Sequence, residues 1–141
     1  SDLAFSGILK TNSKISNIIL QPRSRLNFYS SRQLLDEIDN HRSKLKTLSR
    51  YSDKELNAAI SLITGKIKFI NPELLPSSAY AKAVQLTSDS DIDDTEFVAL
   101  AEHIKGKLWT GDKKLQIGLL RHNWNKIVTT DELYQLVKKR R

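Results

Sequence analysis

The sequence predicts an α/β fold in which helices flank a central parallel sheet. Helical segments with apolar stripes alternate with short apolar strands along the chain, and this order is typical of parallel sheets. Residues 91–115 predict a helix, a strand and a turn, with acids at the start of the helix and just after the strand. Ligands bind at the carboxyl edge of such sheets, so acids that are distant in sequence are expected to meet there.

The composition is that of an ordinary globular domain. With 141 residues, the chain is expected to form one domain over residues 1–141. No apolar run approaches the ~20 residues that a membrane-spanning helix needs, so no membrane association is expected. Cysteine is absent, which excludes disulfides and thiolate metal sites and fits a reducing compartment.

The charges are distributed unevenly. The chain carries 23 Lys and Arg against 16 Asp and Glu, a net charge of +7. The acids concentrate at 36–39 and 89–96, whereas the bases are spread, with one run at 138–141. This pattern suggests cations held at one place with phosphates around them, and hence a nucleic-acid partner. A basic excess that serves only solubility remains the alternative.

Before residue 91, the patterns predict helices and strands in alternation. The helices are expected at 14–20, 31–48, 52–63 and 78–86, and the strands at 26–29 and 66–70. Pro22 ends the first helix, and Ser52 with Glu55 forms a capping-box pattern. No apolar strand precedes Leu9, so we expect the first strand of the sheet to lie largely outside this chain.

The helix predicted at 31–48 carries an acid at the border of its buried stripe. Glu37 lies between Leu34 and Ile38, which belong to that stripe. Its carboxylate could point along the core edge into a cleft, or it could be a solvated charge, and the sequence leaves both interpretations open.

From residue 91 onward, the spacing predicts a second run of elements. It comprises a helix ended by Gly106, a strand at 107–110, a turn at Gly111 and Asp112, a helix at 113–120, a strand at 126–128 and a helix at 131–139. Unpaired acids gathered at one edge would repel one another, so a counter-charge, either a metal ion or bases, is expected beside them. Mg²⁺ takes oxygen ligands and keeps several waters, and two such ions about 4 Å apart can activate water in phosphodiester cleavage.

The same stretch resembles a known family. The pattern D-x-D-D-x-x-F-V-A-L-A over residues 91–101, followed by L-W-T-G-D-K-x-L over 108–115, is similar to the PIN domain, the metal-dependent nuclease fold of VapC-like toxins. The resemblance runs from Asp2 to about Tyr134 and is closest to a branch described as PIN-family toxin components. It implies a three-layer α/β fold with a central parallel sheet.

The resemblance also implies site residues. The late acid of the family falls on Asp94, with Asp91 and Asp93 as second candidates for metal binding. The acid of the T-G-D turn falls on Asp112. Thr110 matches the small hydroxyl residue that typically orients ligands there.

Two further acids are implied by the same resemblance. The glutamate of the pattern L-L-x-E-I falls on Glu37, and the first acid of the family falls near Asp2. The spacing from Asp2 to Phe5 departs from the family pattern by two positions. Either Asp2 is a shifted equivalent of the first acid, or two residues are missing between Asp2 and Leu3.

The resemblance implies a function. It is that of an endoribonuclease that hydrolyses RNA phosphodiester bonds with a water activated by Mg²⁺ or Mn²⁺. Such a protein would be the cytoplasmic toxin of a type II toxin–antitoxin pair, with a small antitoxin over its site, and would usually be a homodimer. The alternative is a non-catalytic PIN-like module that binds RNA or a protein. A different metal-dependent phosphate enzyme fits less well, because the sequence has no glycine-rich phosphate loop.

Basic residues follow the last acid. Lys113, Lys114, Arg121 and Lys126 stand just after Asp112. They could contact the RNA backbone through its phosphates, or they could belong to a solvated helix face, and the sequence favours neither.

Overall fold

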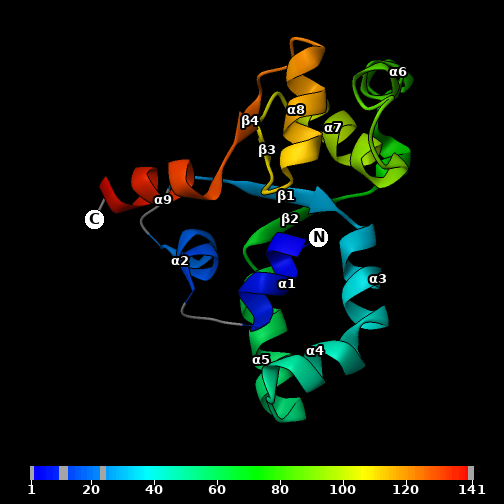
Figure 1. The fold of residues 1–141 in the computed structure, drawn as a ribbon. Coiled ribbons are helices and arrows are strands. Elements are labelled where there is room, and N and C mark those ends of the chain that lie inside the picture. The colour runs from blue at the N-terminus through cyan, green and yellow to red at the C-terminus, as the bar shows by residue number, and fades with distance from the viewer. Residues whose placement is uncertain (1, 10–12, 23–24, 140–141) are drawn as a thin grey trace. The chain divides into compact units, whose positions relative to one another are not determined.

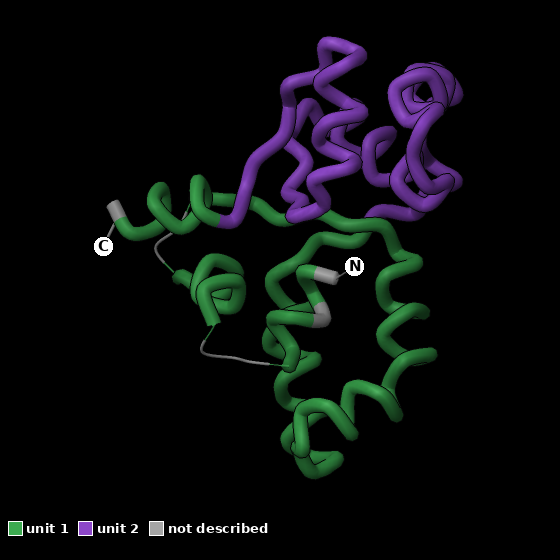
Figure 2. The backbone as a smooth tube through the Cα atoms, in the orientation of Figure 1, with its two compact units in different colours: residues 1–69, 131–141 green, residues 70–130 purple. Residues whose placement is uncertain are grey.

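The computed structural model of the chain describes residues 2–9, 13–22 and 25–139. The chain divides into two compact units (Figure 2): residues 1–69 with 131–141 form unit 1, and residues 70–130 form unit 2. The expectation of one domain over residues 1–141 stays a prediction. No helix in the described part of the chain is both long and apolar enough to cross a membrane.

Unit 1 is mostly helical. Its elements are α1 (Asp2–Leu9), α2 (Lys14–Leu20), β1 (Phe28–Ser31), α3 (Gln33–Asn40), α4 (Arg42–Ser49), α5 (Asp53–Thr64), β2 (Ile67–Ile70) and α9 (Thr130–Lys139) (Figure 1). Helix α1 packs against α2, α4 and α5, and β1 pairs with β2. Aliphatic side chains from these helices form the core; they include Ile8, Ile18, Leu34, Ile38, Leu45, Leu56, Ile63 and Val137.

The single helix predicted at 31–48 is wrong, because the chain breaks at His41. Helix α3 ends at Asn40 and α4 begins at Arg42, while His41 has φ −103° and ψ 14°. The imidazole Nδ1 of His41 lies 2.8 Å from the carbonyl oxygen of Glu37. The apolar stripe also skips positions 41 and 42, so no buried side chain holds a continuous helix there. The other predicted helices and strands are confirmed, with ends displaced by no more than two residues.

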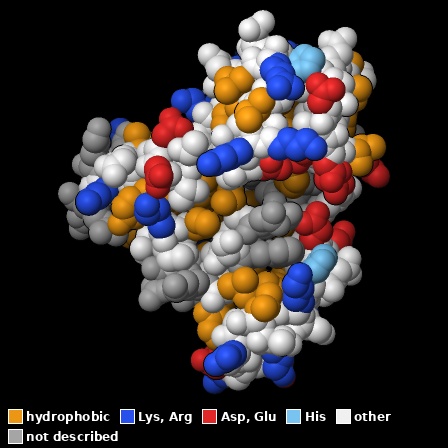
Figure 3. Space-filling view, in the orientation of Figure 1, with side chains coloured by type: hydrophobic (Ala, Val, Ile, Leu, Met, Phe, Trp, Pro, Cys, Tyr) orange, Lys and Arg blue, Asp and Glu red, His pale blue; other side chains and the backbone are white. Residues whose placement is uncertain are grey.

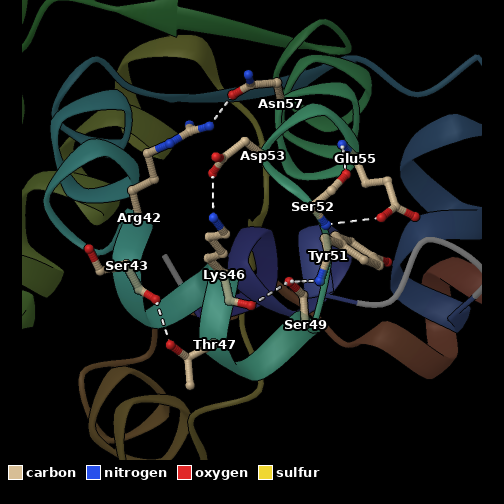
Figure 4. Close-up of polar contacts among 10 residues, drawn as sticks. All are labelled: Arg42, Ser43, Lys46, Thr47, Ser49, Tyr51, Ser52, Asp53, Glu55 and Asn57. Atoms are coloured by element: carbon tan, nitrogen blue, oxygen red, sulfur yellow. Dashed lines mark hydrogen bonds and ion pairs between the residues drawn. The ribbon is translucent and has the colours of Figure 1, made fainter.

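The capping box predicted at the start of α5 is present (Figure 4). The Ser52 hydroxyl accepts a hydrogen bond from the Glu55 backbone N–H at 3.1 Å, and the Glu55 carboxylate accepts one from the Ser52 N–H at 2.9 Å. Lys46 of α4 pairs with Asp53 at 2.9 Å beside this box. The Lys46–Asp53 ion pair joins α4 to the start of α5.

Replacing Ser52 with alanine is expected to lower the free energy of unfolding by about 1 kcal/mol, because an N-cap side chain satisfies a helix N–H that otherwise has no partner. Urea denaturation measures the change. The matched control is Ser61→Ala, an exposed position inside the same helix, where alanine favours the helix and stability should hold or rise slightly. Equal losses in both variants would show that the cap is not the cause.

Unit 2 carries the predicted helix–strand–turn segment. Its elements are the 3₁₀ turn η1 (Pro72–Leu74), α6 (Ser77–Leu86), α7 (Ile92–Ile104), β3 (Leu108–Trp109), α8 (Lys113–Arg121) and β4 (Ile127–Val128) (Figure 1). Helix α6 packs against α7, and both contribute to a core with α8. The buried members of this core include Ala83, Leu86, Val98, Leu100, Leu115, Leu119 and Trp124.

The strands of unit 2 have the predicted parallel direction. Leu108 of β3 lies opposite Ile127 of β4, and Trp109 lies opposite Val128. The mixture of helices and strands and this parallel pair fit the predicted α/β class. Within the described residues, however, the strands form two two-stranded sheets, β1–β2 and β3–β4, and not one central sheet.

The end of α7 differs in detail from the expectation. Lys105, and not Gly106, adopts the left-handed conformation, with φ 56°. The backbone N–H of Gly106 then donates to the Ala101 carbonyl oxygen at 3.0 Å, which satisfies a carbonyl of the last helical turn.

Candidate functional site

The first turn of α7 separates the three clustered acids into different environments. Asp91 is the N-cap, and its carboxylate accepts a hydrogen bond from the Asp93 backbone N–H at 3.2 Å. Asp93 is exposed, whereas Asp94 is half-buried. Asp91 therefore has a structural role at the start of the helix, and Asp94 is the most buried of the three acids.

Pairing of β3 with β4 places the second acid, Asp112. The backbone N–H of Thr110 donates to the Val128 carbonyl oxygen at 3.3 Å, which anchors the end of β3. The Thr110 hydroxyl accepts a hydrogen bond from the Asp112 N–H at 3.0 Å. The Asp112 carboxylate in turn caps α8, because its Oδ1 accepts a hydrogen bond from the Leu115 N–H at 3.1 Å. The turn thus holds Asp112 at both its backbone and its side chain.

Gln116 is a further contact of this turn that the sequence did not single out. Its side-chain Nε2 donates to the Thr110 carbonyl oxygen at 2.9 Å, and its backbone N–H donates to the Asp112 carbonyl oxygen at 3.0 Å. A half-buried glutamine on a helix has no distinctive spacing or motif. Only the way α8 folds back on the end of β3 reveals the contact.

The charges of Asp94 and Asp112 interact, although Asp94 is half-buried and Asp112 is exposed. Burial raises the pKa of Asp94, and the neighbouring charges of Asp112 and Asp91 raise it further. A hydrogen bond with the Asp91 backbone lowers this pKa, but the net shift of the Asp94 pKa is upward. The chain therefore brings two carboxylates from α7 and from the β3–α8 turn close enough to repel each other.

This pair suits a hard divalent cation. Among the residues that the structure describes, no three His, Cys, Asp or Glu side chains converge into a complete metal-binding group. Mg²⁺, however, keeps several waters and is commonly held by one or two carboxylates together with phosphates of a substrate. A cation beside Asp94 and Asp112 would also remove the repulsion that raises the Asp94 pKa. The residues present therefore fit the ion that the sequence implies.

The other two predicted acids belong to unit 1. Glu37 lies on α3, half-buried, with its neighbours Leu34 and Ile38 in the core, as its place at the border of the stripe implied. Asp2 is the first residue of α1, but its side chain lies outside the described part of the structure. Their assignment to the metal site stays a prediction.

The predicted phosphate-binding bases fall into two groups. Lys113, Lys114 and Arg121 are exposed on α8, which starts directly after Asp112. Lys126 instead lies 3.7 Å from the Glu102 carboxylate. On the face drawn in Figure 3, acidic and basic side chains lie next to one another over unit 2.

Glu102 makes several polar contacts near the C-terminal end of α7. Its Oε1 accepts a hydrogen bond from the Trp124 indole N–H at 2.5 Å and lies 3.3 Å from the Lys82 ammonium. Burial alone would raise the pKa of Glu102, but the Trp124 and Lys82 hydrogen bonds and the charge of Lys126 lower it overall. Lys126 thus stabilises the charged form of the half-buried Glu102 carboxylate.

Comparison with known proteins identifies one family. Residues 1–135 match the family model described as the PIN domain. Searches of curated proteins and of solved structures gave no significant match.

Proposed function

We propose a function that starts from one premise: this chain belongs to the PIN domain family. The PIN domain is a nuclease-type fold, and its members generally act as nucleases that use divalent metals. The proposed activity is that of an endoribonuclease that hydrolyses RNA phosphodiester bonds with Mg²⁺ or Mn²⁺.

One observation supports this activity beyond family membership. Asp94 and Asp112 lie in different elements, and yet the charge of Asp112 raises the pKa of Asp94. Two carboxylates that repel each other lower stability unless a counter-charge lies near them. Such pairs are a common feature of phosphoryl-transfer sites.

The side chains have distinct roles in this proposal. Asp94 and Asp112 hold the cation, and Asp91 and Asp93 at the start of α7 are second candidates for binding it. The assignment of Glu37 and Asp2 as ligands stays what the family resemblance implies. Thr110 orients Asp112 through the hydrogen bond to its backbone N–H. The cation, when bound, supplies the positive charge that activates water and stabilises charge developing on the phosphate.

The biological setting is also part of the proposal. The protein is a cytoplasmic toxin of a type II toxin–antitoxin pair, a small antitoxin covers its site, and the toxin is a homodimer. Residues 1–141 are proposed to form a single PIN domain. This setting follows from the resemblance of residues 91–115 to PIN-family toxin components.

Cleavage of a labelled single-stranded RNA tests the activity. We expect the full chain to cut the RNA with Mg²⁺ or Mn²⁺ and to stop cutting when EDTA is added. RNA that is bound but never cut, with either metal, would contradict the nuclease and support the non-catalytic binding module instead.

The exposed bases of α8 provide a surface for the RNA backbone. Single-stranded RNA binding depends on salt with a slope of about 0.7 per phosphate contact. Replacing Lys113, Lys114 and Arg121 together with glutamine is therefore expected to reduce that slope by about 2. RNA binding is measured over a range of salt concentrations in EDTA, so that no RNA is cut.

A charge-matched control separates this surface from the general positive charge of the protein. The control replaces three exposed lysines of unit 1 with glutamine: Lys44, Lys54 and Lys66. It should weaken binding less and leave the salt slope nearly unchanged. Equal slopes for the two triple variants would show that α8 has no special part in RNA binding.

A further inference from the structure

We propose that Gln116 is a positioning residue for the metal-binding carboxylate of Asp112. It acts through the turn of Thr110, Gly111 and Asp112, to which it is joined by hydrogen bonds at both ends. This inference rests on the proposed function, because it concerns the same metal site.

The turn is held by a hydrogen bond at its start, but no packing holds its middle residue. At its start, the Thr110 N–H is bonded to Val128 of β4. In its middle, Gly111 is exposed, and a Cβ added there would meet no other atom within 4 Å. Packing therefore does not hold the turn at Gly111, and hydrogen bonds from its two neighbours must define where Asp112 lies.

Gln116 supplies a further link between this turn and α8. Its side chain reaches back to the Thr110 carbonyl oxygen at 2.9 Å, while its backbone N–H bonds the Asp112 carbonyl oxygen at 3.0 Å. The next residue but one, Gly118, and Leu119 are buried in the unit 2 core. Gln116 thus joins the Thr110–Gly111 peptide to a helix that is anchored in the core through Gly118 and Leu119.

The remaining bonds of the turn cannot replace this one. The Thr110 hydroxyl accepts from the Asp112 N–H, and Asp112 Oδ1 accepts from the Leu115 N–H. The first bond lies within the turn, and the second ties the Asp112 side chain to the first turn of α8, so neither holds the Thr110 carbonyl group. The Gln116 amide bonds the Thr110 carbonyl oxygen and thereby opposes rotation of the Thr110–Gly111 peptide relative to α8.

Partners that orient metal ligands without touching the metal typically change metal affinity about 10- to 100-fold when they are removed. We therefore expect Gln116→Met, which has similar length but no amide, to weaken Mn²⁺ binding by about 10-fold or more. At saturating Mn²⁺ the rate of RNA cleavage should return close to that of the wild type, because Gln116 is not proposed to touch the RNA or the ion.

The experiment measures Mn²⁺ binding to the full chain without RNA, from the electron paramagnetic resonance signal of free Mn²⁺, and the Mn²⁺ dependence of RNA cleavage. Gln85→Met, at an exposed glutamine of α6, is the matched control and should bind Mn²⁺ like the wild type. Thermal unfolding in EDTA shows whether each variant is folded. Gln116→Asn, whose amide is too short to reach Thr110, replaces Gln116→Met if the latter does not fold.

The inference would be supported if the folded Gln116 variant bound Mn²⁺ more weakly while Gln85→Met did not, and if high Mn²⁺ restored RNA cleavage by the Gln116 variant. Mn²⁺ binding equal to the wild type in that variant, while Asp112→Asn binds less Mn²⁺, would overturn the inference and leave the proposed function standing. If the wild type itself bound no Mn²⁺, then the proposed function would fail and this inference with it.

Discussion

Replacing either Asp94 or Asp112 with asparagine is expected to lower metal-dependent RNA cleavage by about 1,000-fold or more. A bound cation contributes several kcal/mol to stabilising charge in phosphodiester cleavage, and each 1.36 kcal/mol corresponds to about a tenfold change in rate. Each asparagine removes the negative charge that holds the cation and keeps the shape of the side chain. The rate is measured with labelled single-stranded RNA at saturating Mg²⁺ or Mn²⁺.

Asparagine is the appropriate replacement at Asp112 because this side chain also caps α8. Asparagine caps a helix about as well as aspartate does, whereas alanine would cost about 1 kcal/mol of stability. Loss of cleavage in Asp112→Asn, with unfolding unchanged, therefore reports on the metal site alone. Comparison with Asp112→Ala separates the cap from the ligand.

The control for both variants is Asp89→Asn. Asp89 is an exposed acid of unit 2 and is not one of the proposed ligands, so its replacement makes the same change in net charge without removing a ligand. Cleavage should be nearly that of the wild type. Cleavage that survives in both Asp94→Asn and Asp112→Asn would show that these carboxylates do not form the active site.

Replacing Asp94 with asparagine is expected to stabilise the metal-free protein while abolishing the stabilisation that metal provides. Burial and the charge of Asp112 raise the pKa of Asp94 above its ordinary value of 3.8. The native protein consequently binds more protons at this carboxyl than the unfolded chain does. Stability must then fall as the pH rises from the ordinary value through the raised pKa.

The sign of this linkage gives a definite pH dependence. In EDTA at neutral pH, Asp94→Asn should be more stable than the wild type, because the wild type must keep a repelled carboxylate charged. The advantage should shrink as the pH falls towards 3.8, where the carboxyl becomes protonated in both native and unfolded states. Urea denaturation at a series of pH values measures it, and Asp89→Asn is again the control.

Added metal should make the wild type more stable than Asp94→Asn. At a Mg²⁺ or Mn²⁺ concentration about 100 times the dissociation constant, the wild type should gain about 2.7 kcal/mol, and Asp94→Asn should gain much less. A wild type that is as stable in EDTA as with metal, and at least as stable as Asp94→Asn, would show that Asp94 holds no cation.

The sequence by itself determined the elements and the family. Apolar spacing and caps are local signals, so most of the helices, the short strands and the Ser52–Glu55 capping box could be predicted from neighbouring residues, whereas helix α1 (Asp2–Leu9) was not predicted. The motif over residues 91–115 was sufficient to recognise the PIN domain, which the match over residues 1–135 then showed. The break at His41 was missed because a stripe with one gap is compatible with either one helix or two.

Only the tertiary structure decided how the acids of unit 2 differ. Asp91, Asp93 and Asp94 are chemically alike and adjacent in sequence, but one caps a helix, one is exposed and one is half-buried beside the charge of Asp112. Burial and Coulomb repulsion depend on distances through space, which follow from the packing of α7 against β3 and not from spacing along the chain. The contact of Gln116 with Thr110 arises in the same way, because it exists only once α8 has folded back on the end of β3.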